Sequence, residues 1–402
     1  MARFHAEIGA SPGRGSYDET TRAAALLAEC RAAIATLINA PSPDSIIFTH
    51  GTTSALNIAI KGLLRPHLAR DERGNPRPLH AVITDMEHNS VLRPVNALAH
   101  EFPELISFTR VAPDPHTGLI DPAAVHAAIQ PNTRLVAAVH ASNVTGTLQP
   151  IDRIGAVCRD MAVPFLVDAA QSVGHLPVDV HAMNTDLLAF PGHKGLLGPL
   201  GTGALYIRPG LERLLHTSVE GGTGSVSEND THPQSIPDKF EPGSHNTVGI
   251  AGLLEGVKHI LNEGIQNIWQ HEQALIAQFI NGLHQHTGGP LLPGLTLLGP
   301  QGVNDRVGVF SVTVDGLAPE TLAKQLEQRF GVLTRPGIHC APHVHRTFAT
   351  DPENAAARGQ QPGATRFSLG PSLSLQDLKH ATDALATICE EHAAQRQNAA
   401  AR

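Results

Sequence analysis

The sequence contains no apolar run that approaches the roughly 20 residues of a membrane-spanning helix. It has no basic stripe either, because 29 lysines and arginines stand against 37 acidic residues, for a formal charge of −8. Such a chain has little with which to neutralise phosphates, which argues against nucleic acid as its main partner. The N-terminus, MARFHAEIGASPGRG, lacks the apolar segment of a signal peptide. We therefore expect a soluble cytoplasmic protein.

Cysteine is scarce, with four residues in a chain of 402, and none of the four belongs to a CxxC pair. Their spacing predicts neither a zinc site nor a disulfide framework. Cys30, Cys158 and Cys389 lie in helical patterns and are expected to be small buried hydrophobes. Cys340 differs, because it lies in a loop beside histidine and proline.

Three histidines, His339, His343 and His345, surround Cys340. A metal site is one interpretation of this cluster. The spacing HCxxHxH fits no common zinc pattern, however, and a chain with 24 histidines produces clusters by chance. We therefore expect no metal.

Strand-like and helical patterns alternate regularly from about residue 20 to residue 210. The run RLVAAVH (Arg134–His140) is apolar almost throughout, as in strands buried on both faces of a parallel sheet. The alternation predicts an α/β fold, with a mainly parallel sheet covered by helices. The expected strands are 45–49, 81–84, 105–110, 134–140 and 165–168, and the expected helices are 20–37, 54–64, 91–100, 122–129 and 151–161.

The C-terminal part has a different pattern, which predicts a smaller α+β domain. We expect a large domain at residues 14–257 and a small domain at 258–402 together with 1–13. The polar segment 65–78 is predicted as a surface loop, and the long glycine-rich segment 221–246 as a functional one. Helices are expected within 249–283 and at 319–330 and 375–395, and strands at 307–314 and 365–369.

Polar residues directly follow four of the expected strands, namely Gly51–Thr53, Glu87–Asn89, Ser142–Asn143 and Asp168. Ligands of parallel sheets bind outside the carboxyl ends of the strands, so the sequence predicts a binding site there. The segment HGTTSALN opens a helix, where backbone N–H groups and hydroxyls form an anion site. A helix cap supplied by one threonine is the plainer interpretation.

The strongest chemical signal is the loop FPGHKGLLGPLGTG (190–203), which sets Lys194 among glycines. Upstream, LVDAAQ places Asp168 and Gln171 just after an apolar strand. A lysine that can form an imine, and an acid that can pair with a pyridinium nitrogen, are what pyridoxal 5′-phosphate (PLP) chemistry requires. GHKG alone could be a surface turn, and such an aspartate is common. Together, and after a phosphate loop, they predict PLP as the cofactor.

The chain resembles the class V aminotransferase-fold enzymes, and most of all their cysteine desulfurase and selenocysteine lyase group. The resemblance extends from about Gly13 to Gly370. It implies PLP-dependent transferase fold type I, with a large PLP-binding domain and a smaller α+β domain. The motifs that carry it are HGTTSALN, MEHNSVLRP, ASNVTGT, VDAAQSVG, FPGHKGLLGPLGTG, GGTGS, KFEPGSHN, RPGIHCAPHVH and TRFSLG.

This resemblance implies cofactor-binding roles. Lys194 would form the imine with PLP and move the substrate α-proton. Asp168 would pair with the pyridine nitrogen, Gln171 would bond the phenolic oxygen, and His88 would stack on the ring. The phosphate would be held by Thr52, Thr53 and His193.

It also implies roles toward substrate and partner. Asn143 and Arg366 would take the substrate carboxylate, and Cys340 would attack the substrate sulfur. Ser244, in the loop that crosses to the partner subunit in this family, would reach the partner's phosphate. Taken singly, Asn143 could be a turn residue. Likewise, Arg366 alone could be a structural arginine. His88 alone could be a loop histidine whose ring is hydrogen-bonded within the protein.

The function that follows is a PLP-dependent cysteine desulfurase, which converts L-cysteine into L-alanine and an enzyme-bound persulfide. The alternatives are another class V enzyme, such as a selenocysteine lyase, aminotransferase or epimerase, in which Cys340 is incidental, and a non-catalytic family member. We expect a homodimer with an amino-acid substrate and a sulfur-acceptor protein. Two departures stand out: Pro191 replaces the usual serine or threonine, and the family's opening strand with its DNAAT-like motif has no counterpart.

Overall fold

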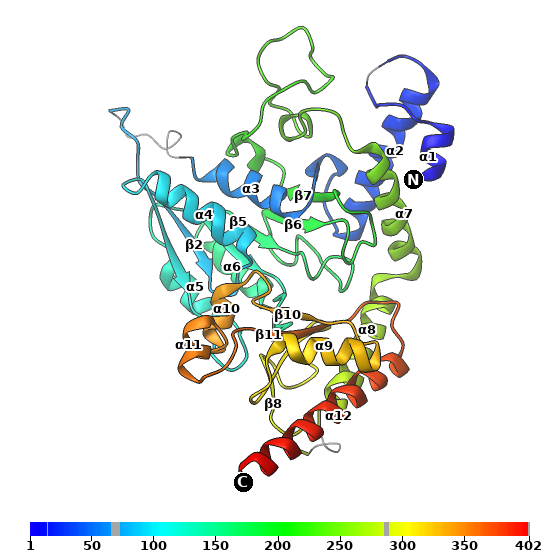
Figure 1. Cartoon of the computed structure of the whole chain (residues 1–402). Helices are drawn as coiled ribbons and strands as arrows, with labels where there is room; N and C mark the ends of the chain where they lie inside the picture. Colours follow the sequence, from blue (N-terminus) through cyan, green and yellow to red (C-terminus); the bar gives the residue numbers. More distant parts are fainter. Residues whose placement is uncertain (14, 66–72, 285–288, 401–402) are drawn as a thin grey trace.

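The computed structural model describes residues 1–13, 15–65, 73–284 and 289–400. Part of the predicted loop 65–78 therefore lies outside the described residues. Figure 1 shows the molecule built around two sheets, one above the other, with the C-terminal helix projecting at the lower end.

Seven strands of the described chain form the first sheet, in the order β1-β7-β6-β5-β4-β2-β3. β7 runs antiparallel to both of its neighbours, and the other strands all point the same way. The predicted α/β class with a mainly parallel sheet is confirmed. The strands are β1 (Ile46–Thr49), β2 (Leu79–Thr84), β3 (Ile106–Val111), β4 (Thr133–Val139), β5 (Phe165–Asp168), β6 (Leu187–Pro191) and β7 (Gly203–Ile207).

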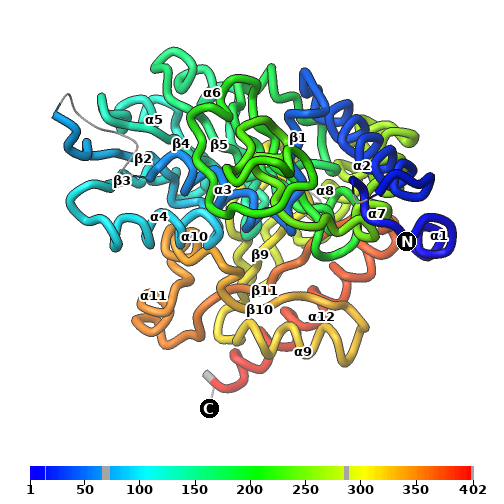
Figure 2. The backbone as a smooth tube through the Cα atoms, turned by 90° about the horizontal axis from the view of Figure 1, so that it is seen from above, coloured from blue at the N-terminus to red at the C-terminus, as the bar shows by residue number. Residues whose placement is uncertain are grey.

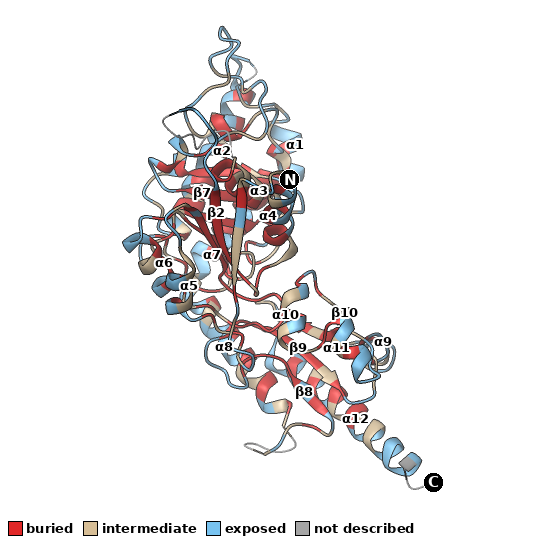
Figure 3. Cartoon of the chain, turned by 90° about the vertical axis from the view of Figure 1, so that its left-hand side faces the viewer, coloured by how far each residue is buried: buried red, intermediate tan, exposed pale blue. Residues whose placement is uncertain are grey.

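Helices cover both faces of this sheet, because alternate strand residues point to opposite sides. In β5, Phe165 and Val167 pack into the core shared with α2, α5, α6 and α7. Leu166 packs into the core shared with α3 and α4. Figure 3 shows the buried strands β2 and β7 of this sheet in red. The helices are α1 (Ala2–Glu7), α2 (Asp18–Leu37), α3 (Thr52–Leu63), α4 (Asn89–Glu101), α5 (Pro122–Ala128), α6 (Ile151–Asp160) and α7 (Thr247–Glu263).

The second sheet is antiparallel, with four described strands in the order β10-β11-β9-β8. Its core contains a Phe279–Phe310–Phe367 cluster, with ring centroids 4.4 and 5.1 Å from that of Phe279. The strands are β8 (Leu295–Leu297), β9 (Val309–Val314), β10 (Arg335–Gly337) and β11 (Ala364–Ser368). The helices of this C-terminal part of the chain are α8 (Ile265–Gly282), α9 (Pro319–Phe330), α10 (Pro342–Thr347), α11 (Pro352–Ala357) and α12 (Leu375–Ala400). Short 3₁₀ turns lie at Pro43–Ser45, Leu211–Arg213 and Asp238–Phe240.

The predicted domain boundary falls inside a continuous helix, since α7 runs through residue 257. At the other end of the chain, Phe4 packs against Ala23 of α2 and Ala251 of α7. The boundary stays a prediction. Within the described residues, no helix has the length and apolar character needed to cross a membrane.

The strand directions bring the predicted polar residues to one place. β1, β2, β4, β5 and β6 are parallel to one another, so their carboxyl ends share one edge of the sheet. The loops that follow them carry four of the predicted polar groups: Gly51–Thr53, Glu87–Asn89, Ser142–Asn143 and Asp168.

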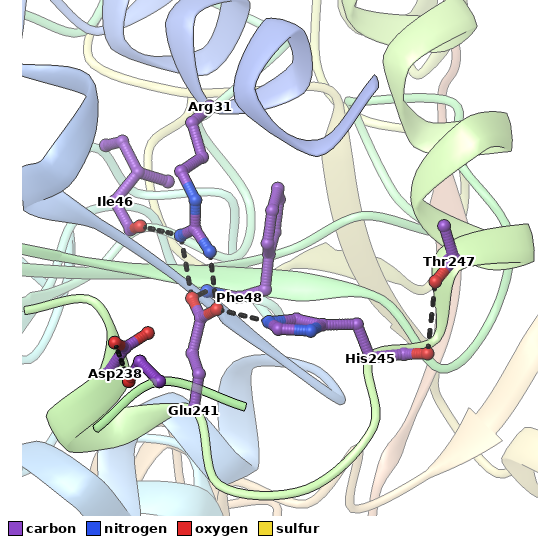
Figure 4. A network of polar contacts seen from close by, with 8 residues as sticks. Arg31, Ile46, Phe48, Asp238, Glu241, His245 and Thr247 are labelled. Atoms are coloured by element: carbon purple, nitrogen blue, oxygen red, sulfur yellow. Dashed lines mark hydrogen bonds and ion pairs between the residues drawn. The ribbon is translucent and has the colours of Figure 1, made fainter. Parts of the chain in front are cut away.

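A buried charge network fixes the loop before α7 to the first sheet (Figure 4). The Arg31 guanidinium donates to both carboxylate oxygens of Glu241 and to the Ile46 carbonyl. The Phe48 amide and the His245 ring lie within 2.6 Å of the same carboxylate. The side chains of Arg31 and Glu241 are only 9% and 3% exposed. This network ties α2 and β1 to residues 241–245.

We expect Arg31→Met to lower the free energy of unfolding by about 3 kcal/mol, because it leaves a buried carboxylate without its cation. The matched control is Lys379→Met, which breaks the exposed Lys379–Asp383 pair and should cost less than about 1 kcal/mol. Urea unfolding of both variants measures the difference. An equal loss of unfolding free energy in the two variants would contradict a stabilising role of the buried Arg31–Glu241 pair.

The loss of unfolding free energy caused by Arg31→Met should become smaller at acid pH. Burial raises the pKa of Glu241, but hydrogen bonds from His245 and Arg31 outweigh burial and hold that pKa below its ordinary value. A carboxyl with a depressed folded pKa stabilises above its unfolded pKa of about 4.3, and the stabilisation is lost as pH falls through the folded pKa. The stability gap between Arg31→Met and the parent should therefore shrink below about pH 4.

Candidate active site

A cavity of about 560 Å³ lies at the carboxyl edge of the first sheet. It receives residues from the loops after β1, β2, β4, β5 and β6. Eight predicted site residues line it: Thr52, Thr53, His88, Asn143, Asp168, Gln171, His193 and Lys194. Three others do not line it: Ser244, Cys340 and Arg366.

Asp168 and Lys194 form the charged centre of the cavity. Burial raises the pKa of Asp168, although the Lys194 charge and the Ala170 amide act in the opposite direction. Burial likewise lowers the pKa of Lys194, against the pull of Asp168. Asp168 Oδ1 accepts from the Ala170 amide at 3.0 Å, while Oδ2 accepts no hydrogen bond from the described residues. One carboxylate oxygen is therefore available for a ligand.

Close backbone packing fixes the loop that carries Lys194. A Cβ on Gly174 would lie 2.3 Å from the Gly195 carbonyl carbon, and one on Gly195 would lie 2.4 Å from the Val173 oxygen. Gly174 also has a φ of +88°, which favours glycine. The loops after β5 and β6 thus cross in contact. Side chains at these glycines would clash with the backbone of the other loop.

His88 opens α4 with its side chain as the N-cap, because Nδ1 accepts the Ser90 amide at 3.1 Å. The neutral ring therefore carries its proton on Nε2. Burial lowers the pKa of His88 to about 4, assisted by the charges of Lys194, Arg335, Arg93 and Arg366. The ring is neutral at ordinary pH.

The start of α3 has the features of an anion site. Gly51 is the N-cap, and no side chain caps this helix, so the simple-cap interpretation of the threonines is wrong. The N–H groups of the first turn have no helical partner. The Thr53 hydroxyl lies 2.8 Å from that of Ser90. His193 and Pro191 also line the cavity, and Pro191 contributes neither a hydroxyl nor an N–H.

Cys340 lies in the turn between β10 and α10, and its thiol is exposed. This turn is bonded to the cavity rim: the Asn89 amide donates to the Cys340 carbonyl at 2.8 Å, and the Asn143 side chain donates to the His339 carbonyl at 2.7 Å. Figure 2 shows α10 beside α4. Asn143 therefore contacts the cysteine loop.

Two arginines stand opposite each other beside this turn, since Arg335 of β10 and Arg366 of β11 are register partners. Arg366 Nη1 donates to the Asn143 carbonyl at 2.9 Å, and its buried Nε has no partner among the described residues. Burial, together with the Arg335 charge, lowers the pKa of Arg366 to about 10. Arg335 Nη2 lies 3.6 Å from Cys340 Sγ. Like charges directly opposite repel, which favours an anion between them.

Ser244 lies outside the cavity of its own chain. It is exposed and lines two neighbouring hollows, one beside α3 and one beside α2. The described residues contain no cluster of three or more histidine, cysteine or acidic side chains suited to a metal ion.

Several residues near the site were not predicted. His50, Ser54, Asn57 and Ser90 line the cavity, and Arg335 approaches Cys340. The first four lie inside or next to motifs that were recognised, so adjacency was an available signal. For Arg335 the signal was its place in RPGIHCAPHVH.

The donor set fits PLP. An acid with a free oxygen and a half-buried amine without a hydrogen-bond partner among the described residues face one cavity. The open first turn of a helix meets the need of a phosphate. These are the groups that the pyridine nitrogen, the aldehyde and the phosphate of PLP require.

Comparison with known proteins gives a consistent result. The family description aminotransferase class V matches residues 1–380. The chain is 35% identical over 344 residues to a probable cysteine desulfurase of Methanothermobacter thermautotrophicus, covering 85% of this chain and 80% of that protein. It is 34% identical over 342 residues to a cysteine desulfurase of Yersinia pestis, covering 84% and 79%.

A solved structure is also similar: the apo cysteine desulfurase of Thermococcus onnurineus, with a TM-score of 0.85 and 28% identity, covering 97% of this chain and 90% of that one. The sequence match and the fold lead to the same family. The chain belongs to the class V aminotransferase family.

Proposed function

We propose that this protein is a PLP-dependent cysteine desulfurase. The observation that carries the proposal is the exposed Cys340 thiol, in a turn whose backbone is hydrogen-bonded to Asn89 and Asn143 at the rim of the cavity. A desulfurase needs a thiol that is accessible and yet held beside the substrate. The desulfurase names of the similar proteins support the same reaction.

We propose that Asp168 and Gln171 bind the ring of PLP, and that His88 stacks on it. The first turn of α3, with Thr52, Thr53 and His193, would hold the phosphate. Bound PLP supplies an electron sink for the carbon that bears the substrate amine. Lys194 Nζ would carry the proton of that carbon, because burial lowers its pKa toward the range of a useful base.

The substrate carboxylate is assigned to Arg366. Its buried Nε has no partner among the described residues, and a guanidinium matches a carboxylate in bidentate geometry. Asn143 would hold the turn and Arg366 rather than bind the carboxylate alone, since its side chain and carbonyl are both engaged.

In the sulfur-transfer step, the Cys340 thiolate bonds to the substrate sulfur as the substrate Cβ–S bond breaks. The electron pair of that bond stays with the carbon fragment, which gains a proton and leaves as alanine. Cys340 then carries the persulfide, which an acceptor protein would take. Arg335, close to Cys340 Sγ, would stabilise the negative sulfur.

We also propose a homodimer in which Ser244 reaches the phosphate site of the partner. The exposed position of Ser244, in a loop held by the Arg31–Glu241 pair, supports this arrangement. The two-domain division and the cytoplasmic location stay predictions.

Lys194→Ala should abolish the visible absorbance of lysine-bound PLP and lower sulfide release by at least about a thousandfold. The reason is the loss of both the covalent attachment and the proton carrier. Far-UV circular dichroism should show an intact fold. Lys324→Ala, on the exposed face of α9, is the control and should retain both signals. A borohydride-reducible PLP linkage that persists in Lys194→Ala would overturn the assignment.

Cys340→Ser should bind PLP normally and still change the PLP spectrum on addition of L-cysteine. Its sulfide release should fall by about a thousandfold or more, because a hydroxyl does not replace the thiolate. Cys389→Ala removes a buried cysteine of the same part of the chain and should remain active. Normal desulfuration by Cys340→Ser would make Cys340 incidental.

Sedimentation of the purified protein should give the mass of a dimer. In that dimer, Ser244→Ala should weaken PLP binding by about tenfold, as expected for a lost hydrogen bond to a charged group. The control is Ser227→Ala, an exposed position of the same loop. A monomer that binds PLP tightly, or equal affinity of the two variants, is the contrary result.

A further inference from the structure

Two consecutive residues of the cysteine turn have left-handed backbones, with φ of +56° at His339 and +61° at Cys340. Neither is glycine, so each is in a sparsely populated region and stores strain. Such a turn persists only where its surroundings determine it. The contacts of these two residues must therefore hold the turn in this conformation.

The bonds to Asn89 and Asn143 hold the two carbonyls, but they do not involve the His339 ring. This ring is buried and continues a chain of hydrogen bonds. His339 Nε2 lies 2.8 Å from the Arg335 carbonyl, and His339 Nδ1 lies 3.2 Å from His345 Nε2. His345 Nδ1 lies 2.8 Å from the Thr350 hydroxyl.

The carbonyl at one end sets the direction of every bond in this chain. A carbonyl only accepts, so His339 Nε2 donates to it and, in the neutral ring, Nδ1 accepts. His345 Nε2 must then donate, which makes His345 Nδ1 the acceptor of the Thr350 hydroxyl proton. One tautomer is therefore specified for each ring.

Both rings are held neutral. Burial lowers the pKa of His339 to about 3 and that of His345 to about 4. The charges of Arg366, His345 and Arg335 also disfavour a charge on His339, against the effect of its bond to the Arg335 carbonyl. Asp351 and the Ile338 carbonyl favour a charge on His345, but burial outweighs them. The chain is thus a fixed set of bonds and not a proton carrier at neutral pH.

We propose that His345, through this chain, is a positioning residue for Cys340. It fixes the His339 ring and thereby keeps the left-handed turn that holds Cys340 against Asn89 and its thiol beside Arg335. His345 is fully buried and does not line the cavity, so it acts through His339. This inference rests on the proposed desulfurase function for its meaning, but not for its structural test.

The test compares His345→Leu with His345→Gln in the PLP-loaded enzyme. Leucine fills space but donates nothing, whereas the glutamine amide supplies an N–H toward His339 Nδ1. In His345→Leu the Asn89 amide, which is bonded to the Cys340 carbonyl, should exchange its hydrogen about tenfold faster. Sulfide release should fall by about ten- to a hundredfold, as expected for a displaced nucleophile.

PLP affinity and the spectral change with L-cysteine should be unaltered, because they precede the action of Cys340. His345→Gln should restore both the Asn89 protection and the sulfide release. Thr350→Val, which is nearly isosteric, should show the same changes as His345→Leu in weaker form and serves if His345→Leu does not fold. The matched control is His380→Leu, which breaks an exposed ring-to-carbonyl bond on α12.

Two results would overturn the proposal: unchanged Asn89 exchange in both His345→Leu and Thr350→Val, or failure of His345→Gln to behave better than His345→Leu. A failed desulfurase assignment looks different. In that case the wild type releases no sulfide, while the exchange rate of the Asn89 amide still differs between His345→Leu and His345→Gln.

Discussion

The opposite charges of Asp168 and Lys194 interact at a sheet edge where burial penalises each of them. Neither charge is tolerable there alone, so the surroundings must hold both in place. The parallel strands β5 and β6 deliver them to the same edge, and the contact of Gly174 with Gly195 fixes the distance between their loops. This arrangement leaves one carboxylate oxygen and one amine without hydrogen-bond partners among the described residues.

The second sheet contributes to this edge through a small number of directed bonds. The carbonyls of His339 and Cys340 accept from Asn143 and Asn89, and Arg366 donates back to the Asn143 carbonyl. A fourth contact joins His343 to Asp85 at 3.5 Å. The position of the thiol relative to the cavity therefore depends on residues about 200 and 250 positions away in the chain. A substitution at Asn143 would disturb the cysteine turn and the arginine together.

Periodicity predicted the elements whose apolar pattern is long, such as the helix at 319–330, which α9 matches. It missed β6 and β7, which flank the glycine-rich loop 190–203, because strands of five residues are too short to give a clear periodic pattern. The carboxyl-edge residues were predictable, since strand direction alone gathers them. The partners of Asn143, the Arg335–Arg366 register and the His339–His345 chain were not, because each depends on tertiary contacts that no local pattern encodes.

Proline explains why the strain in the cysteine turn stays where it is. Pro342 opens α10, and the residue before a proline is disfavoured in the helical region. Ala341 accordingly lies outside the helical region, with φ −138° and ψ 71°, so the helix does not extend backward into the turn. On the other side, Arg335–Gly337 is held in β10 by its register with β11. Between two fixed ends, the chain reverses within a few residues, and left-handed conformations at His339 and Cys340 supply that reversal. The same conformations turn both carbonyls toward Asn143 and Asn89, so the strain and the bonds that offset it have one geometric origin.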